Sequence, residues 1–139
     1  MTEAVTDNQV INVSCVVDRD PKFAMQAWNW LLSLRASGTR AKPFICCVDG
    51  ALTEGQKERF ASLGAYVTPI ASFGTGLAAY CNKIEQLRNH HVVDCDWLIL
   101  SDADVCFLGK LEGLLSGASF RAKPVDLSSP SREDLEFWM

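Results

Sequence analysis

The sequence contains no hydrophobic run long enough to cross a membrane, because charged residues interrupt every apolar stretch well short of the roughly 18 residues that a spanning helix needs. Residues 1–9 are acidic and polar and do not resemble a secretory signal. Basic residues are not in surplus either, with 13 Lys and Arg against 17 Asp and Glu. We therefore expect a cytoplasmic protein with a flexible N-terminus over residues 1–9, no transmembrane segment and no nucleic-acid partner.

Two short motifs are also missing. No C-x-x-C pair occurs, which argues against zinc knuckles and thioredoxin-type sites, and the glycines do not form a G-x-G-x-x-G. The cysteines mostly lie inside apolar runs, and cytosolic thiols stay reduced. We therefore expect small buried hydrophobic residues rather than disulfides at Cys15, Cys46, Cys47, Cys81, Cys95 and Cys106.

What the chain does contain is an alternation of strand-like and helix-like segments. Its 139 residues, 48% of them hydrophobic, match the size and composition of one globular domain. Apolar runs ending in turn residues predict strands over residues 10–17, 43–48, 65–70 and 97–101. Helix-like segments separate these runs. The pattern predicts an α/β fold, a Rossmann-like three-layer sandwich with a mostly parallel sheet, over residues 10–127.

Three helices are predicted between the strands. Gly38 is a fitting stop for the first, and Thr53-Glu54-Gly55-Gln56 has the form of a capping box that starts the second. Apolar residues at helical spacing indicate the buried faces of the first and third helices. The residues expected there are Ala24, Ala27, Trp28, Leu31 and Leu32 in the first helix and Leu77, Tyr80, Cys81, Ile84 and Leu87 in the third.

The end of the chain differs from the rest. Residues 120–126 have the pattern of a short extended piece, and Ser131 can cap a helix after the loop at residues 128–130. The sequence then ends on large apolar residues with nothing after them to cover. We expect residues 128–139 to be the start of a truncated C-terminal helix, whose apolar end favours self-association.

Carboxylates follow three of the predicted strands: Asp18 and Asp20, Asp49, and Asp102 with Asp104. In doubly wound sheets, ligands bind outside the carboxyl ends of the strands, so these acids are expected at one edge. Two carboxylates at i and i+2 can reach one hard cation, such as Mg²⁺ or Mn²⁺, that bridges to phosphates. The pattern indicates a diphosphate site.

The D-x-D spacing is weak evidence by itself, because chance predicts about 0.7 occurrences at this Asp content. Three occur. Asp94-Cys95-Asp96 precedes its strand and is expected in an exposed loop. Asp18-Arg19-Asp20 adjoins a proline, so turn chemistry explains it as well as a site does. Asp102-Ala103-Asp104 has the best context, because apolar residues flank it on both sides.

The segment Leu98-Ile99-Leu100-Ser101-Asp102-Ala103-Asp104-Val105-Cys106-Phe107 resembles the apolar strand and D-x-D of nucleotide-sugar-dependent glycosyltransferases of the GT-A fold. Asn82-Lys83-Ile84 is similar to the N-K pattern of glycogenin-like members. The resemblance follows element order over residues 10–127. It implies a GT-A type domain that binds a nucleotide-diphospho-sugar donor, of the UDP type, and transfers the sugar to an acceptor. Since family members continue well beyond the D-x-D, the chain resembles a truncated N-terminal, donor-binding part.

The resemblance also implies roles for individual residues. Asp104 would ligate Mn²⁺ or Mg²⁺ on the donor diphosphate, Asp102 would contact the ribose or the metal, and Lys83 would lie near the phosphates or sugar. His90 and His91 are expected at a helix C-terminus as surface residues rather than ligands. No catalytic residue is assigned. The expected nucleotide-sugar-binding residues are Val17, Asp18, Arg19, Asp49, Lys83, Asp102 and Ala103, and the expected metal ligands are Asp102 and Asp104.

Three other interpretations account for part of the pattern. A receiver-like phospho-signalling domain would use the acidic pair after the first strand, Asp49 as phosphoacceptor and Lys123, although the distance along the chain from Asp49 to Lys123 suits it poorly. A haloacid-dehalogenase-like phosphatase would need its D-x-D on the first strand rather than the fourth. The third is a non-catalytic fragment that binds nucleotide weakly or not at all.

Overall fold

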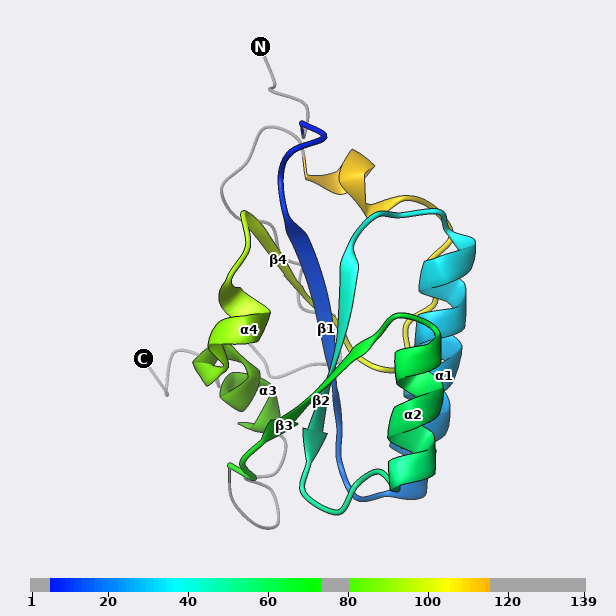
Figure 1. Ribbon diagram of the computed structural model, residues 1–139, viewed down its shortest axis with the longest axis vertical. Coiled ribbons are helices and arrows are strands. Elements are labelled where there is room, and N and C mark those ends of the chain that lie inside the picture. Colours follow the sequence, from blue (N-terminus) through cyan, green and yellow to red (C-terminus); the bar gives the residue numbers. More distant parts are fainter. Residues whose placement is uncertain (1–5, 74–80, 116–139) are drawn as a thin grey trace, which may run out of the picture.

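The structure is a computed structural model that describes residues 6–73 and 81–115 (Figure 1). Its sheet has four strands in the spatial order β3-β2-β1-β4, and every pairing is parallel. Each strand lies where the sequence predicts it, to within one residue at either end. The predicted α/β Rossmann-like fold is confirmed. The strands are β1 (Ile11–Val17), β2 (Lys42–Val48), β3 (Tyr66–Ile70) and β4 (Trp97–Leu100).

Helices cover both faces of this sheet (Figure 1). On one face, called here the α1 face, lie α1 (Pro21–Ala36) and α2 (Glu54–Ser62). On the other, the α4 face, lie α3 (Asn82–Glu85), the 3₁₀ turn η2 (Gln86–Arg88) and α4 (His90–Val93). Alternate residues of each strand therefore face two different environments.

The buried face of α1 differs in part from the predicted one. Ala24, Ala27 and Leu31 are buried as expected, but Leu32 is 43% exposed and Trp28 is only partly buried. Trp30 and Leu34 take their places, and both are fully buried. The reason is that α1 carries large apolar residues around more than half of its circumference, so hydrophobicity alone does not determine which side meets the sheet.

Capping residues set the starts of both helices on the α1 face. Asp20 accepts a hydrogen bond from the backbone N–H of Lys22, and proline occupies the first turn of α1. The predicted capping box of α2 is confirmed, because Thr53 and Gln56 each bond the other's backbone N–H. Phe60 then anchors α2 against the core.

The α4 face agrees only in part with the predicted third helix. Residues 77–80 lie outside the described residues, and α3 continues directly into η2, so residues 82–88 are helical, but the buried side differs from the predicted one. Ile84 and Leu87, expected inside, are 47% and 46% exposed, while Asn82, Glu85 and Gln86 are buried. The physical reason lies in β1, whose polar residues on this face need polar partners.

Two hydrogen bonds from β1 meet part of that need, although Asn12 Oδ1 has no partner among the described residues. Ser14 Oγ donates to Gln86 Oε1 over 2.6 Å, and Asn12 Nδ2 donates to the Val92 carbonyl over 2.9 Å. Both β1 side chains are buried. Unpaired polar groups would be costly there, so the Gln86 side chain and the Val92 carbonyl, rather than the Leu87 side chain, face these residues of β1.

The histidine pair is exposed, as predicted, but its expected place at a helix C-terminus is wrong. His90 and His91 begin α4, and the side chain of Asn89 caps that helix by accepting from the His91 backbone N–H. Both histidines therefore lie at the N-terminal end of α4, and not at a C-terminal end, where the helix dipole is expected to stabilise them. Asp94 and Asp96 lie in an exposed segment before β4, as predicted.

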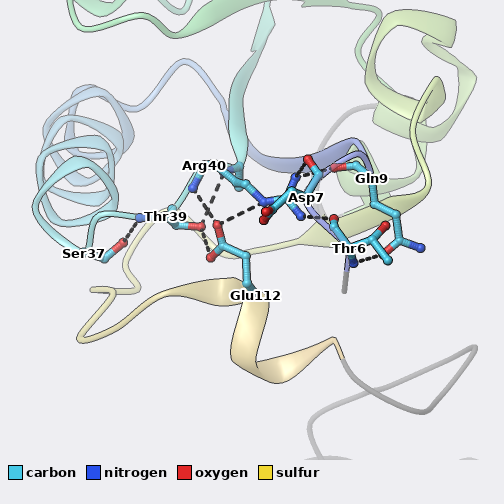
Figure 2. Close-up of polar contacts among 8 residues, drawn as sticks. Thr6, Asp7, Gln9, Ser37, Thr39, Arg40 and Glu112 are labelled. Atoms are coloured by element: carbon cyan, nitrogen blue, oxygen red, sulfur yellow. Dashed lines mark hydrogen bonds and ion pairs between the residues drawn. The ribbon is translucent and has the colours of Figure 1, made fainter. Parts of the chain in front are cut away.

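Beyond β4 the chain turns and runs past α1 to the 3₁₀ turn η3 (Leu111–Leu114). Figure 2 shows how Glu112 of this turn joins Thr39 and Arg40, and how Arg40 donates to the carbonyls of Thr6, Asp7 and Gln9. Residues 6–9 of the expected flexible N-terminus are thus bound to Arg40. The expected extended piece at residues 120–126 and the C-terminal helix at 128–139 lie outside the described residues.

The cysteines differ in burial, and Cys81 and Cys95, predicted to be buried, are only partly so. Cys15, Cys46 and Cys47 are buried as predicted, and burial raises the pKa of Cys46 to about 12. Cys106 is exposed, contrary to prediction, because it follows the turn after β4 rather than continuing a buried strand. Within residues 6–73 and 81–115, no helix is both long and apolar enough to span a membrane.

Candidate functional site

A crevice of about 610 Å³ lies at the carboxyl ends of β1 and β4. Its walls come from the end of β1, the first turns of α1, the start of α3 and the turn after β4. The lining residues are Val16, Asp18, Asp20, Lys22, Phe23, Gln26, Asn82, Lys83, Ser101, Asp102, Ala103 and Asp104.

The order of the strands explains why a crevice lies there. From β1 the chain proceeds outward through β2 to β3, and it then returns to the opposite side of β1 to form β4. The connection that leaves β1 lies on the α1 face, whereas the segment that enters β4 lies on the α4 face (Figure 1). These connections diverge between β1 and β4. Doubly wound sheets bind their ligands at such a switch point.

The carboxylate of Asp18 is oriented by α3. Asn82 Nδ2 donates to Asp18 Oδ2 over 2.8 Å, while Asn82 Oδ1 accepts from the backbone N–H of Phe73 over 2.7 Å. Asn82 is 2% exposed, so its amide is held at both ends inside the protein. The other oxygen of Asp18 accepts from the Arg19 backbone N–H. Asp18 therefore has a defined position at one wall.

An ion pair joins two walls of the crevice. Lys83 Nζ, from α3, donates to Asp102 Oδ1, which follows β4. Both side chains are more than half exposed. A second pair, Lys22 Nζ with Asp20 Oδ2 at 3.6 Å, lies at the start of α1. Each lysine of the crevice is thus beside an aspartate.

The turn that carries Asp102 and Asp104 is anchored from inside the protein. Trp30 Nε1, fully buried in α1, donates to Ser101 Oγ over 3.0 Å, and Ser101 Oγ donates to the Asp102 carbonyl over 2.9 Å. The Ser101 backbone N–H donates to the Ser14 carbonyl of β1. Buried Ala103 lies between the two carboxylates and faces the core. This arrangement fixes the backbone from which both acids project.

Five of the sequence-predicted site residues line the crevice together: Asp18, Lys83, Asp102, Ala103 and Asp104. They come from three separate parts of the chain, and the sheet brings them to one edge. The structure therefore places the D-x-D turn, the lysine of the N-K pair and the first-strand aspartate around a common space.

The other three predicted residues lie elsewhere. Val17 is fully buried in the core on the α1 face, and its neighbour Val16 lines the crevice instead, because successive strand residues face opposite sides. Arg19 and Asp49 are exposed and do not line the crevice. Arg19 Nε donates to the Asp49 carbonyl over 3.0 Å, which joins the turns after β1 and β2.

Sequence reasoning missed the residues that orient the site. The N-K pattern includes Asn82 but does not predict its hydrogen bond to Asp18, and the apolar run before Ser101 predicts only the end of a strand. The apolar spacing of Ile84 and Leu87 pointed to a different buried face, which concealed the role of Asn82. The available signal was a polar residue directly before Lys83 and another directly before Asp102.

The carboxylates suit a hard cation only with help from a ligand. Within the described residues, no group of three or more His, Cys, Asp or Glu side chains could hold a metal ion. Asp102 and Asp104 both line the crevice and could offer carboxylate oxygens, and Mg²⁺ in proteins is commonly bound by one or two carboxylates completed by substrate phosphates. The donor set fits a cation that arrives together with a phosphate-bearing ligand.

The electrostatic balance of the crevice supports the same conclusion. Four aspartates and two lysines line it, so a diphosphate alone would meet an excess of negative charge. A divalent cation would reverse that balance locally.

No protein-family model matches the chain, and no curated protein matches its sequence. The crevice itself is therefore the basis for any statement about function.

Proposed function

We propose that this chain binds a nucleotide-diphospho-sugar donor, of the UDP type, as the donor-binding part of a glycosyltransferase. The observation that carries the proposal is the crevice at the switch point of the sheet, which gathers a D-x-D turn, a lysine and a first-strand aspartate. The sequence has no G-x-G-x-x-G motif, which favours recognition through a cation and a lysine over a dinucleotide-type cradle.

The crevice offers distinct surfaces for the parts of such a donor. Val16 and Phe23 provide apolar contact for a nucleobase, and Asp18, oriented by Asn82, can accept a hydrogen bond from a base or ribose. Asp102 and Asp104 would hold Mn²⁺ or Mg²⁺ against the diphosphate. The bound cation would supply neutralisation of the leaving diphosphate.

Calorimetry with UDP provides the first test. We expect UDP to bind the purified chain in the presence of Mn²⁺ and at least about tenfold more weakly without it, because charge-assisted contacts carry the diphosphate. The double variant Asp102→Asn, Asp104→Asn should lose binding to a similar extent, since both changes remove cation ligands while keeping side-chain size.

A matched control lies at the other end of the same strand. Asp94→Asn, Asp96→Asn removes the same charges from the same motif before β4, and an asparagine at position 96 can still accept from the Val10 backbone N–H. This variant should bind UDP like the unaltered chain. The proposal is contradicted if UDP binds equally well without Mn²⁺, or if the Asp102→Asn, Asp104→Asn variant still binds it. It is also contradicted if the folded, unaltered chain does not bind UDP, a result that favours a fragment without a nucleotide site.

A further inference from the structure

The ion pair between Lys83 and Asp102 uses a carboxylate that the proposed cation would need. Lys83 Nζ contacts Asp102 Oδ1 directly, so an ammonium group stands at one of the two aspartates of the D-x-D turn. A divalent cation that takes Asp102 as a ligand would have to approach the same oxygen. The two positive groups repel each other at contact distance and cannot share that oxygen at low cost.

We propose that Lys83 is a displaceable counter-ion: its ammonium group neutralises Asp102 as long as no divalent cation is bound, and moves to the donor diphosphate when such a cation binds Asp102 and Asp104. This inference rests on the proposed function, because it concerns the same crevice and the same ligand. It adds a role for one residue, and an order of events, that the donor site alone does not require.

The geometry around Lys83 suits such an exchange. The preceding residue, Asn82, is buried and bonded to Asp18 and to the Phe73 backbone, so the backbone from which Lys83 projects is held in place. The Lys83 side chain itself is 58% exposed. A fixed base and an exposed four-carbon stem allow the ammonium group to move while α3 stays where it is.

The strength of the pair also suits an exchange. Ion pairs between exposed lysine and carboxylate groups are weak, because solvent screens them and the side chains lose freedom in forming them. Lys83 and Asp102 are both more than half exposed, so a cation with two carboxylate ligands can displace the ammonium group. The displaced ammonium is then beside the phosphates that complete the cation's coordination.

The exchange predicts that cation and diphosphate help each other to bind. The cation releases Lys83 for the phosphates, and the phosphates provide the released lysine with a new partner. Because coupling between two binding sites is reciprocal, each ligand should raise the affinity for the other. Removing the lysine should therefore affect the two ligands in opposite directions.

The test measures Mn²⁺ alone, by the electron spin resonance signal of the free ion, and UDP at saturating Mn²⁺, by calorimetry. In Lys83→Met we expect Mn²⁺ alone to bind roughly three- to tenfold more tightly, since it no longer displaces an ammonium group. UDP with Mn²⁺ should bind roughly tenfold more weakly, because one charge-assisted phosphate contact is lost. Lys83→Arg, which keeps the charge, should return both affinities toward those of the unaltered chain.

Lys22→Met is the matched charge control. Lys22 lines the same crevice but pairs with Asp20. Its loss therefore changes the electrostatic potential of the crevice but leaves the ion pair between Lys83 and Asp102 in place. We expect it to change Mn²⁺ affinity by less than about twofold. Equal tightening in both variants, or no Mn²⁺ binding by Lys83→Met, overturns the exchange. Failure of the unaltered chain to bind UDP with Mn²⁺ instead overturns the proposed function and with it the transfer of Lys83 to a diphosphate, and the Mn²⁺ comparison then decides only whether Lys83 and the cation compete for Asp102.

Discussion

The two faces of the sheet are covered in different ways. On the α1 face, β1 presents Ile11, Val13, Cys15 and Val17 to long, capped helices, and the contact is almost entirely apolar. On the α4 face the same strand presents buried polar residues, and short turns cover them through side-chain hydrogen bonds. β1 therefore has a different residue pattern on each face of the sheet.

The comparison shows which physical force selects each layer. Apolar burial is non-directional, so it fixes that a helix packs on the α1 face but leaves its rotation to the details of shape. Hydrogen bonds are directional, so opposite Asn12 and Ser14 on the α4 face they decide which residues point inward even against hydrophobicity. The crevice lies where these two layers diverge, and Asn82 from one layer and Trp30 from the other hold lining residues in place, through hydrogen bonds to Asp18 and Ser101.

The largest expected effect tests the rotation of α1. Leu34→Ala should lower the free energy of unfolding by about 2–5 kcal/mol, because it opens a cavity at a fully buried site. Leu32→Ala removes the same atoms two residues away from a side chain that is 43% exposed, and should cost less than about 1 kcal/mol. Urea unfolding of both variants gives the comparison. Equal losses would support the apolar face predicted from the sequence instead.

A smaller effect is expected on the α4 face, from the pair formed by Ser14 and Gln86. Ser14→Ala leaves the buried Gln86 carbonyl oxygen without its donor and should cost about 1–3 kcal/mol in urea unfolding. Gln86→Leu alone should cost a similar amount, because the Ser14 hydroxyl loses its acceptor.

The double variant Ser14→Ala, Gln86→Leu sharpens this test. It replaces both partners with apolar groups and removes the Gln86 amide nitrogen, which has no hydrogen-bond partner among the described residues. We expect it to lose less stability than the two single changes add up to, by at least about 1 kcal/mol. Additive losses would mean that the hydrogen bond does not hold the α4 face together.

Much of the fold follows from local sequence signals. The four strands end at turn residues, and the capping box at Thr53 is satisfied by groups three residues apart, so both could be predicted from neighbouring residues alone. The inward direction of Gln86 and Asn82 could not, because their partners on β1 and after it lie more than 60 residues away along the chain. Hydrophobic spacing alone instead predicts that Ile84 and Leu87 point inward.

The candidate site follows the same rule. The edge that gathers Asp18, Asp102 and Asp104 could be predicted, because carboxyl ends of parallel strands meet at one edge. The sequence could not show that Val17 faces the core instead of the crevice. The pattern of β1 does not indicate which of its two sets of alternating residues packs against α1. The pairing of Lys83 with Asp102 depends on how α3 approaches the sheet, which no local pattern encodes.

The smallest expected effect concerns a polar contact at the rim of the apolar α1 face. Glu112, in a turn whose Leu111 packs into that core, accepts from the Arg40 backbone N–H over 2.7 Å and from Thr39 Oγ1 over 2.8 Å (Figure 2). Partial burial raises the pKa of Glu112, but the Arg40 amide, its own backbone amide, the Thr39 hydroxyl and the Arg40 charge together outweigh burial and lower the pKa below its ordinary value.

A lowered pKa in the folded state means that the ionised carboxylate stabilises the fold. That contribution is complete above about pH 5 and is lost as the pH falls through the lowered pKa. Glu112→Gln should therefore cost about 1 kcal/mol at neutral pH, and its difference from the unaltered chain should shrink below about pH 4. Urea unfolding across this range measures both. Glu54→Gln, at an exposed ion pair with Lys57, should cost about 0.5 kcal/mol or less. A Glu112→Gln cost that stays constant with pH would show that ionisation of Glu112 does not contribute to the stability of the rim.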